Sequence, residues 1–335
     1  MSNDTLATLL RPKSFAEIVG QESIVSILSR QTATKKIKHA YLFCGAHGCG
    51  KTTTARVFAN SLNDNEGHVI EIDAASNNGV DCIRTLISDS QQMAIDCKYK
   101  VYVIDECHMM TSAAWNAALK LLEEPPKHAV FILCTTNPDK IPGTILSRVQ
   151  RFDFKRIDTK TIADKLEYIC NEITHSKYER EALDRIAIKA DGYMRDAITD
   201  LDKCLDYSND LTLDSIEKVL GLVKEASLLE IVNNLLNKDI TKSLNELEQL
   251  KSISNDLVQV YDSLLSFVIE YAIYDKTYSI NCVNIPRSYE DKLYKDKLEF
   301  LTKFATRLFE CRKNVTSSNA EVFIRMILLE MTNED

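Results

Sequence analysis

The chain has 335 residues, of which 45% are hydrophobic and 27% charged, with 9 glycines and 6 prolines. At roughly 150 residues per domain this length predicts two or three domains, and the composition excludes a disordered chain, a collagen and a linker array. The net charge of -8 argues against a chain covered by nucleic acid. Residues 1–156 carry 18 basic and 16 acidic side chains, so only this part is expected to face phosphates, through a local patch.

The uninterrupted apolar runs, such as 40–44 and 129–134, are far shorter than the roughly 18 residues that a membrane-spanning helix needs, so no span is predicted. The N-terminus has no positive charge ahead of an apolar core, which favours a cytoplasmic chain. The ten cysteines include no CxxC pair, so no zinc site is expected. Several lie in apolar runs, where a reduced thiol is favoured over a disulfide.

The first half of the chain alternates strand-like and helix-like segments. The strand-like segments are rich in Val, Ile, Phe and Tyr and apolar on both faces, which is typical of strands that are buried on both faces of a sheet. They are 40–45, 68–73, 100–106 and 129–136, and the helical segments between them are 51–62, 80–95 and 112–123. This order predicts a parallel α/β sheet with helices on both sides, in a domain spanning 1–156.

After residue 156 the pattern becomes helical. The segments 161–173, 179–190, 195–206 and 213–220 predict a small helical domain over 157–222, with a break at Asp191 and Gly192. Long amphipathic segments over 225–274, a turn region over 275–291 and helices over 294–312 and 320–331 predict a third, all-helical domain over 223–335. The tyrosines between 271 and 294 are interpreted as part of an interhelix loop rather than as a single-strand binder, because acidic residues dilute them.

The sequence GAHGCGKT over 45–52 fits the pattern GxxxxGK[ST] between a buried strand and a helix. Glycines allow the backbone N–H groups to curl around a phosphate at a helix N-terminus, Lys51 adds a charge, and the Thr52 hydroxyl reaches Mg²⁺. This context favours a phosphate-binding loop over a chance glycine-rich turn.

Further candidate side chains follow the buried strands. Asp105 and Glu106 end the segment KVYVIDE, where Asp105 is expected to hold Mg²⁺ and Glu106 to polarise the attacking water. Thr136 ends the next strand with a hydroxyl that can orient water or the γ-phosphate. Without a family argument, Arg148 is interpreted as a solvated surface charge, and Arg195 as an ion-pair partner of Asp191 or Asp196 within a helix. The six histidines show no paired spacing and are assigned to packing or the surface, and Trp115 to the core.

Eight segments together resemble the gamma/tau subunits of the bacterial DNA polymerase III clamp loader, over about the first two-thirds of the chain. They are RPKSFAEIVGQE, GAHGCGKT, EIDAASNNGVD, KVYVIDECHMM, WNAALKLLEEPP, TTNPDKIPGTILSR, RFDFKRI and GYMRDAITDLD. The resemblance implies an α/β P-loop AAA+ module, made of a RecA-like domain and a helical lid, followed by an all-α collar domain that joins subunits into a heteropentamer. It implies ATP hydrolysis, with ATP and Mg²⁺ as cofactors.

The resemblance also implies a role for individual residues. Arg11, Pro12 and Val19 fall on the adenine side, Thr136 takes the sensor position, Arg195 feels the γ-phosphate from the lid, and Arg148 is the finger that reaches the ATP of a neighbouring subunit. The phosphates are cradled by Gly45, Ala46, His47, Gly48, Cys49, Gly50, Lys51, Thr52 and Thr53. Arg84, Lys120 and Lys140 match positions that face the backbone of primer-template DNA.

Two departures from the family are visible. The four-cysteine zinc module is replaced by the short segment 63–67, so no zinc is expected, and no tau-like extension follows Asp335. The leading hypothesis is an ATPase motor that places a sliding clamp on primed DNA with the other loader subunits, without polymerase chemistry of its own. The alternatives are a poorly hydrolysing scaffold subunit of the same kind of complex and another AAA+ DNA machine such as a branch-migration helicase.

Overall fold

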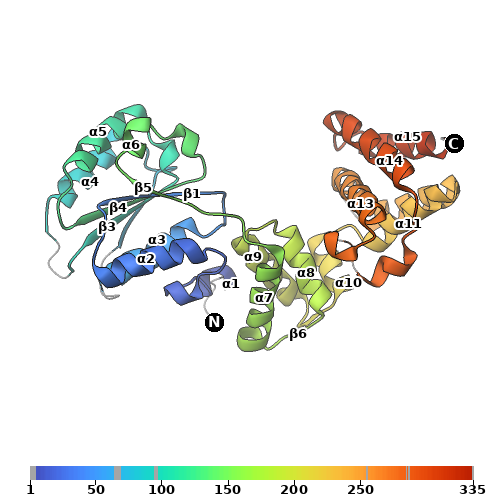
Figure 1. Cartoon of the computed structure of the whole chain (residues 1–335), viewed down its shortest axis with the longest axis horizontal. Coiled ribbons are helices and arrows are strands. Elements are labelled where there is room, and N and C mark those ends of the chain that lie inside the picture. Colours follow the sequence, from blue (N-terminus) through green and yellow to red (C-terminus); the bar gives the residue numbers. More distant parts are fainter. Residues whose placement is uncertain are drawn as a thin grey trace. The chain divides into compact units, whose positions relative to one another are not determined.

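The structure is a computed structural model, and it describes residues 5–63, 69–93, 97–253, 256–283, 285 and 287–333. Its contacts divide the chain into two compact units, Met1–Asp206 and Tyr207–Asp335 (Figure 1). The three domains expected over 1–156, 157–222 and 223–335 stay a prediction. Residues 64–67 of the short segment 63–67 that takes the place of the zinc module, and His68 at the start of the second expected strand, lie outside the described residues.

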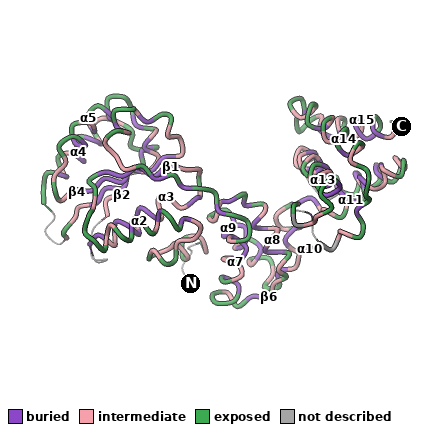
Figure 2. Tube along the Cα trace, viewed as in Figure 1, coloured by how far each residue is buried: buried purple, intermediate pink, exposed green. Residues whose placement is uncertain are grey.

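A five-stranded parallel sheet forms the centre of the first unit. Its strands are β1 (Ala40–Cys44), β2 (Val69–Asp73), β3 (Lys100–Asp105), β4 (Ala129–Thr135) and β5 (Gln150–Asp153). They lie in the order β2-β3-β4-β1-β5, with Phe43 opposite Cys134 and Asp73 opposite Asp105. All residues of β1 and β4 are buried, as Figure 2 shows by colour, which explains why their sequences are apolar on both faces. The sequence prediction of a parallel α/β sheet is confirmed.

Helices cover both faces of this sheet (Figure 1). One face carries α2 (Glu22–Thr34) and α3 (Lys51–Leu62), and the other carries α4 (Val80–Ser90), α5 (Ser112–Glu123) and α6 (Gly143–Leu146). The expected helix over 80–95 ends earlier, at Ser90. Trp115 on α5 is 4% exposed and belongs to the core under the second face, as predicted. A short helix α1 (Leu6–Leu9) precedes them, and its first N–H donates to Asp202 Oδ2 at 2.9 Å.

The first unit continues into a group of helices after the sheet. These are α7 (Thr159–Ile169), which runs into a π-helical turn over Cys170–Thr174, α8 (Arg180–Lys189) and α9 (Met194–Tyr207), with the short strand β6 (Lys177–Tyr178) before α8. Asp158 caps α7 by accepting a hydrogen bond from the Thr161 N–H at 2.8 Å. Ile162, Leu166 and Ile186 are completely buried, so the apolar side chains at helical spacing form a core here as the sequence predicts.

The second unit consists mainly of helices. They are α10 (Leu213–Leu220), α11 (Glu225–Leu236), α12 (Ile240–Ile253), α13 (Leu257–Thr277), α14 (Leu298–Cys311) and α15 (Ala320–Thr332), with β7 (Asp210–Leu211) before α10. The turn region expected over 275–291 is partly wrong, because α13 continues to Thr277 and short 3₁₀ turns follow at Ile280–Cys282 and Arg287–Lys292. The helix expected from residue 294 begins at Leu298.

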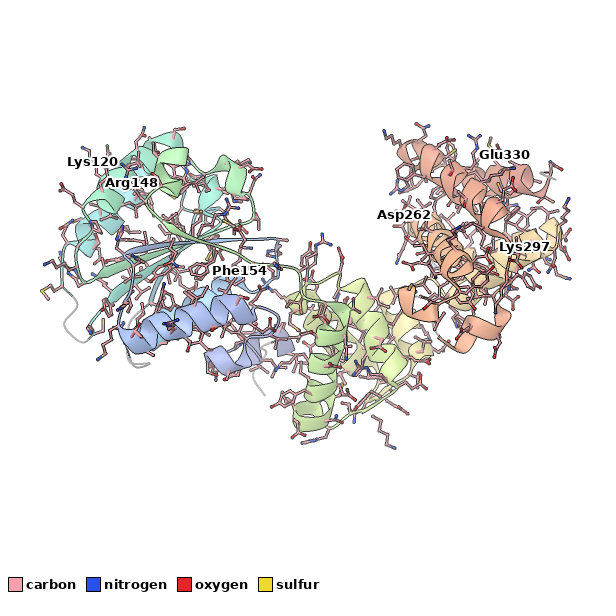
Figure 3. The ribbon with its side chains drawn as sticks, in the orientation of Figure 1. Lys120, Arg148, Phe154, Asp262, Lys297 and Glu330 are labelled. Atoms are coloured by element: carbon pink, nitrogen blue, oxygen red, sulfur yellow. The ribbon has the colours of Figure 1, made fainter. Side chains whose placement is uncertain are left out.

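By length and composition alone, α13 is long and apolar enough to cross a membrane. The sequence does not show this as an uninterrupted apolar run, because Asp262 and Glu270 interrupt the segment. Tyr261 and Tyr271 of this helix are completely buried in the core of the second unit. Asp262, labelled in Figure 3, forms an ion pair with Arg312. One face of the helix therefore packs within this unit, while Ile269 and Ile273 are exposed.

Candidate active site

The loop between β1 and α3 curls because of its glycines. Gly45, Gly48 and Gly50 all have positive φ angles, of 154°, 74° and 98°. A Cβ atom at Gly45 would lie 2.8 Å from the carbonyl oxygen of Phe154, so this position has no room for a side chain. The loop ends at the N-terminus of α3, where backbone N–H groups are free to bind an anion.

Lys51 begins α3 and is 5% exposed. Its ammonium group donates to the carbonyl oxygens of Gly45 and Ala46, both at 2.9 Å, so the lysine lies inside the curl of the loop. The hydroxyl of the next residue, Thr52, donates to Asp105 Oδ2 at 2.8 Å. Magnesium prefers hydroxyl and carboxylate oxygens together with phosphate and water oxygens, so this pair fits the metal that the sequence predicts. Within the described ranges no three His, Cys, Asp or Glu side chains gather as a metal cluster.

Glu106 follows β3 in a left-handed backbone conformation, with φ of 45°. Its Oε2 accepts a hydrogen bond from the hydroxyl of Thr136 at 2.9 Å and lies 3.3 Å from the Thr136 backbone nitrogen. The same oxygen lies 3.2 Å from His108 Nδ1. The structure therefore joins the two residues that the sequence assigned to water activation and to the sensor position, and it adds a histidine that the sequence assigned to packing or the surface.

The turn between α8 and α9 lies against the phosphate loop. A Cβ at Gly48 would be 3.2 Å from Tyr193 Cβ, and the Arg156 guanidinium lies 5.2 Å from the centre of the Tyr193 ring. Asp191 forms an ion pair with Arg156 at 2.6 Å, so the pairing of Asp191 with Arg195 that the sequence allowed is wrong. The turn between α8 and α9 thus packs against the phosphate loop through Tyr193.

The residues expected on the adenine side lie on separate elements near the loop. Arg11 and Pro12 precede the 3₁₀ turn Phe15–Glu17, and Val19 follows it, all half-buried. Thr53, which was expected to contact the phosphates, lies half-buried on the first turn of α3. Burial, together with repulsion from Arg56 and Arg195, lowers the pKa of the Arg11 guanidinium. Arg195 itself is exposed at the start of α9. Their roles toward a nucleotide stay predictions.

Arg148 follows α6 and is held within its own subunit. It donates to Glu123 Oε1 at 2.7 Å and to the Thr144 carbonyl oxygen at 2.7 Å. Figure 3 labels it with Lys120, on the side of the sheet that α5 and α6 cover. Arg84, Lys120 and Lys140 are exposed, and Arg84 pairs with Asp81 at 3.0 Å. Neither the finger role nor the DNA contacts are tested by this geometry.

Three positions that sequence reasoning did not single out belong to this region: Gln21, His108 and Tyr193. Gln21 is 5% exposed and donates to the carbonyl oxygens of Cys49 and Lys155, at 3.3 and 2.7 Å, which ties the loop to the segment after β5. The signal for all three was their place inside segments that carry the family resemblance, VGQE for Gln21, DECHMM for His108 and GYMRDAITDLD for Tyr193. Burial raises the pKa of the Cys49 thiol in the loop, which keeps it protonated.

Comparisons with known proteins agree with this geometry. A family model described as DNA polymerase III, delta subunit, matches residues 20–77 and 67–158. The tau subunit of DNA polymerase III from Bacillus subtilis is 38% identical, over 82% of this chain and 52% of that protein, so the chain spans about half the length of this relative. The gamma subunit from Buchnera aphidicola subsp. Baizongia pistaciae is 32% identical, over 99% of this chain and 98% of that protein.

Among solved structures, the RuvB Holliday junction branch migration motor of Thermotoga maritima superposes with a TM-score of 0.55 at 18% identity, over 68% of this chain and 79% of that one. At this identity the likeness shows the fold alone, and it confirms the predicted AAA+ fold followed by helices. The relatives that cover most of the chain decide the family. The chain belongs to the gamma/tau subunits of bacterial DNA polymerase III.

Proposed function

We propose that this chain is an ATP-hydrolysing motor subunit of a sliding-clamp loader in DNA replication. The observation that carries the proposal is the convergence of four side chains at the carboxyl edge of the sheet. Lys51 follows β1 and its loop, Asp105 and Glu106 lie at the end of β3, and Thr136 follows β4. Ligands of open α/β sheets bind at this edge. The names of the relatives support a subunit of the replicative polymerase.

Each residue has a defined task in ATP hydrolysis. The N–H groups of residues 45–53 and the Lys51 ammonium bind the triphosphate. Thr52 and Asp105 would hold Mg²⁺, which would withdraw charge from the phosphate oxygens. Glu106 accepts a proton from the attacking water, and Thr136 orients the Glu106 carboxylate through the 2.9 Å hydrogen bond. Arg195 approaches the γ-phosphate from the start of α9.

The site is completed by a neighbouring subunit in this proposal. Arg148 leaves Glu123 and reaches the ATP of the adjacent subunit, a contribution worth about 10³ to 10⁵ in rate in well-studied NTPases. The partners are the other loader subunits, in a hetero-oligomer of five, the sliding clamp and primer-template DNA in the cytoplasm. Arg84, Lys120 and Lys140 would bind DNA phosphates, so DNA stimulation should weaken as salt rises.

Steady-state ATP hydrolysis tests the proposal, measured with the chain alone and then with sliding clamp, primed DNA and the other loader subunits. We expect stimulation on assembly, loss of turnover in Lys51→Ala, and loss of the stimulation alone in Arg148→Ala. Arg151→Ala is the matched control, because Arg151 is a nearby exposed arginine that pairs with Asp153 at 2.7 Å. Binding of ATP with no turnover under any condition would overturn the motor and leave a scaffold subunit.

A further inference from the structure

The His108 side chain lies beside the carboxylate of Glu106. It belongs to the 3₁₀ turn Cys107–Met109, and its side chain is 13% exposed. Its Nδ1 is 3.2 Å from Glu106 Oε2 and 3.2 Å from the hydroxyl of Thr135, the last residue of β4. The histidine therefore bridges the ends of β3 and β4 at the point where the proposed base lies.

The chemistry of the neighbours decides which ring nitrogen carries hydrogen. An ionised carboxylate only accepts hydrogen bonds, so a nitrogen 3.2 Å from Glu106 Oε2 stabilises it only when that nitrogen bears a hydrogen. The Thr135 hydroxyl oxygen already accepts from the Asn137 N–H at 3.0 Å and accepts equally well from Nδ1–H. A hydrogen on Nδ1 is therefore compatible with both neighbours, the carboxylate 3.2 Å away and the hydroxyl to which Nδ1 is hydrogen-bonded, whereas a bare Nδ1 would turn a lone pair toward the carboxylate.

The polar contacts of Glu106 fall on one carboxylate oxygen. Oε2 of Glu106 faces the Thr136 hydroxyl, the Thr136 N–H and His108 Nδ1, at 2.9, 3.3 and 3.2 Å. Among the described residues, Oε1 of Glu106 has no hydrogen-bond partner. One oxygen is thus anchored and the other is presented to the site, as a proton acceptor must be.

We infer that His108 is a positioning residue for ATP hydrolysis, which donates from Nδ1 to Glu106 and so fixes the carboxylate with Oε1 directed at the attacking water. This inference rests on the proposed function. It assigns a hydrogen-bonding task to a residue outside the phosphate loop, the sensor and the arginines. A donor to an ionised group contributes more than a neutral hydrogen bond, so its removal should lower kcat by about tenfold or more.

The test compares His108→Ala with His108→Asn, because the Asn amide nitrogen takes the place of Nδ1 and keeps a donor. Under the stimulated conditions we expect kcat of His108→Ala to fall about tenfold with KM for ATP unchanged, and His108→Asn to recover most of the loss. His128→Ala is the control, since His128 Nε2 contacts the Ser90 carbonyl at 2.9 Å just before β4 begins, at the opposite end of that strand. Thermal unfolding of each variant separates a loss of structure from a loss of rate.

A second readout does not depend on turnover. The ¹⁵N resonances of labelled histidine, assigned with His108→Asn, should show Nδ1 as the protonated nitrogen of His108, and Glu106→Gln should shift this resonance. Unchanged kcat in His108→Ala, or a kcat above that of the wild type, would overturn the inference while the wild type still hydrolyses ATP. Absence of turnover in the wild type would instead overturn the proposed function.

Discussion

Replacing Gly192 by alanine would place a methyl group where the structure has no room for one. Gly192 has φ of 87°, and a Cβ there would lie 2.6 Å from Arg156 Cβ and 3.2 Å from the Ile157 carbonyl oxygen. The positive φ costs roughly 1–2 kcal/mol for a residue with a Cβ. The clash involves the base of the Arg156 side chain, which cannot rotate away, and overpacking of this kind costs about 1–3 kcal/mol more. Gly192→Ala should therefore destabilise the first unit by about 2–5 kcal/mol.

Urea unfolding followed by tryptophan fluorescence measures this cost. Trp115 is the single tryptophan of the chain and lies buried in the first unit, so its signal reports on that unit alone. Gly50→Ala is the comparison: φ is 98° but nothing lies within 4 Å of the added Cβ, so only the backbone cost of roughly 1–2 kcal/mol is expected. Equal losses in the two variants would refute the argument that close packing against Arg156 fixes this turn.

Three further outcomes follow from the contacts. A hydrogen bond from Lys100 lowers the pKa of Asp89, so the stability that this half-exposed group contributes, under about 1 kcal/mol, is present above pH 4 and is lost as pH falls through the folded pKa. Asp89→Asn should therefore lower stability more at pH 7 than at pH 2, and an equal loss at both would contradict this. Because burial raises the pKa of Cys49, iodoacetamide should modify exposed Cys282 well before Cys49 in the native chain, as peptide mapping would show; the reverse order would contradict it. Tyr271→Phe removes the acceptor of a backbone N–H in the second unit and should cost about 1–3 kcal/mol in circular-dichroism unfolding, where no loss would refute the contact.

The sheet and the phosphate loop were predictable because their signals are local. Continuous apolar runs such as 129–134 are typical of strands buried on both faces, and the pattern GxxxxGK[ST] fixes its own place between strand and helix. Asp105 and Glu106 follow from the same logic, since they end a buried strand. The family resemblance then assigned Thr136, and the structure brings this residue to Glu106.

The remaining features depend on contacts between distant segments. Nothing in the sequence around Tyr193 indicates that it packs on Gly48, 145 positions earlier. The sequence also does not indicate that Asp191 pairs with Arg156 rather than with Arg195, four positions later. The place of His108 inside the segment DECHMM did not indicate a task for it, and its contact with Thr135 becomes visible only when β4 lies beside this turn. A long helical segment was predicted where α13 lies, but its agreement with the length and hydropathy of a membrane-crossing helix was missed because two acidic residues interrupt its apolar run.

The order β2-β3-β4-β1-β5 has a consequence for how the chain acquires its site during folding. The phosphate loop leaves β1, but the strand that lies between β1 and the acidic end of β3 is β4, which is made about 85 residues later in the chain. Pairings over such sequence distances form slowly, because the intervening loop must lose its entropy first. In a chain emerging from the ribosome, Thr52 therefore has no acidic strand end opposite it until β4 inserts, and nucleotide affinity would report the completion of the sheet.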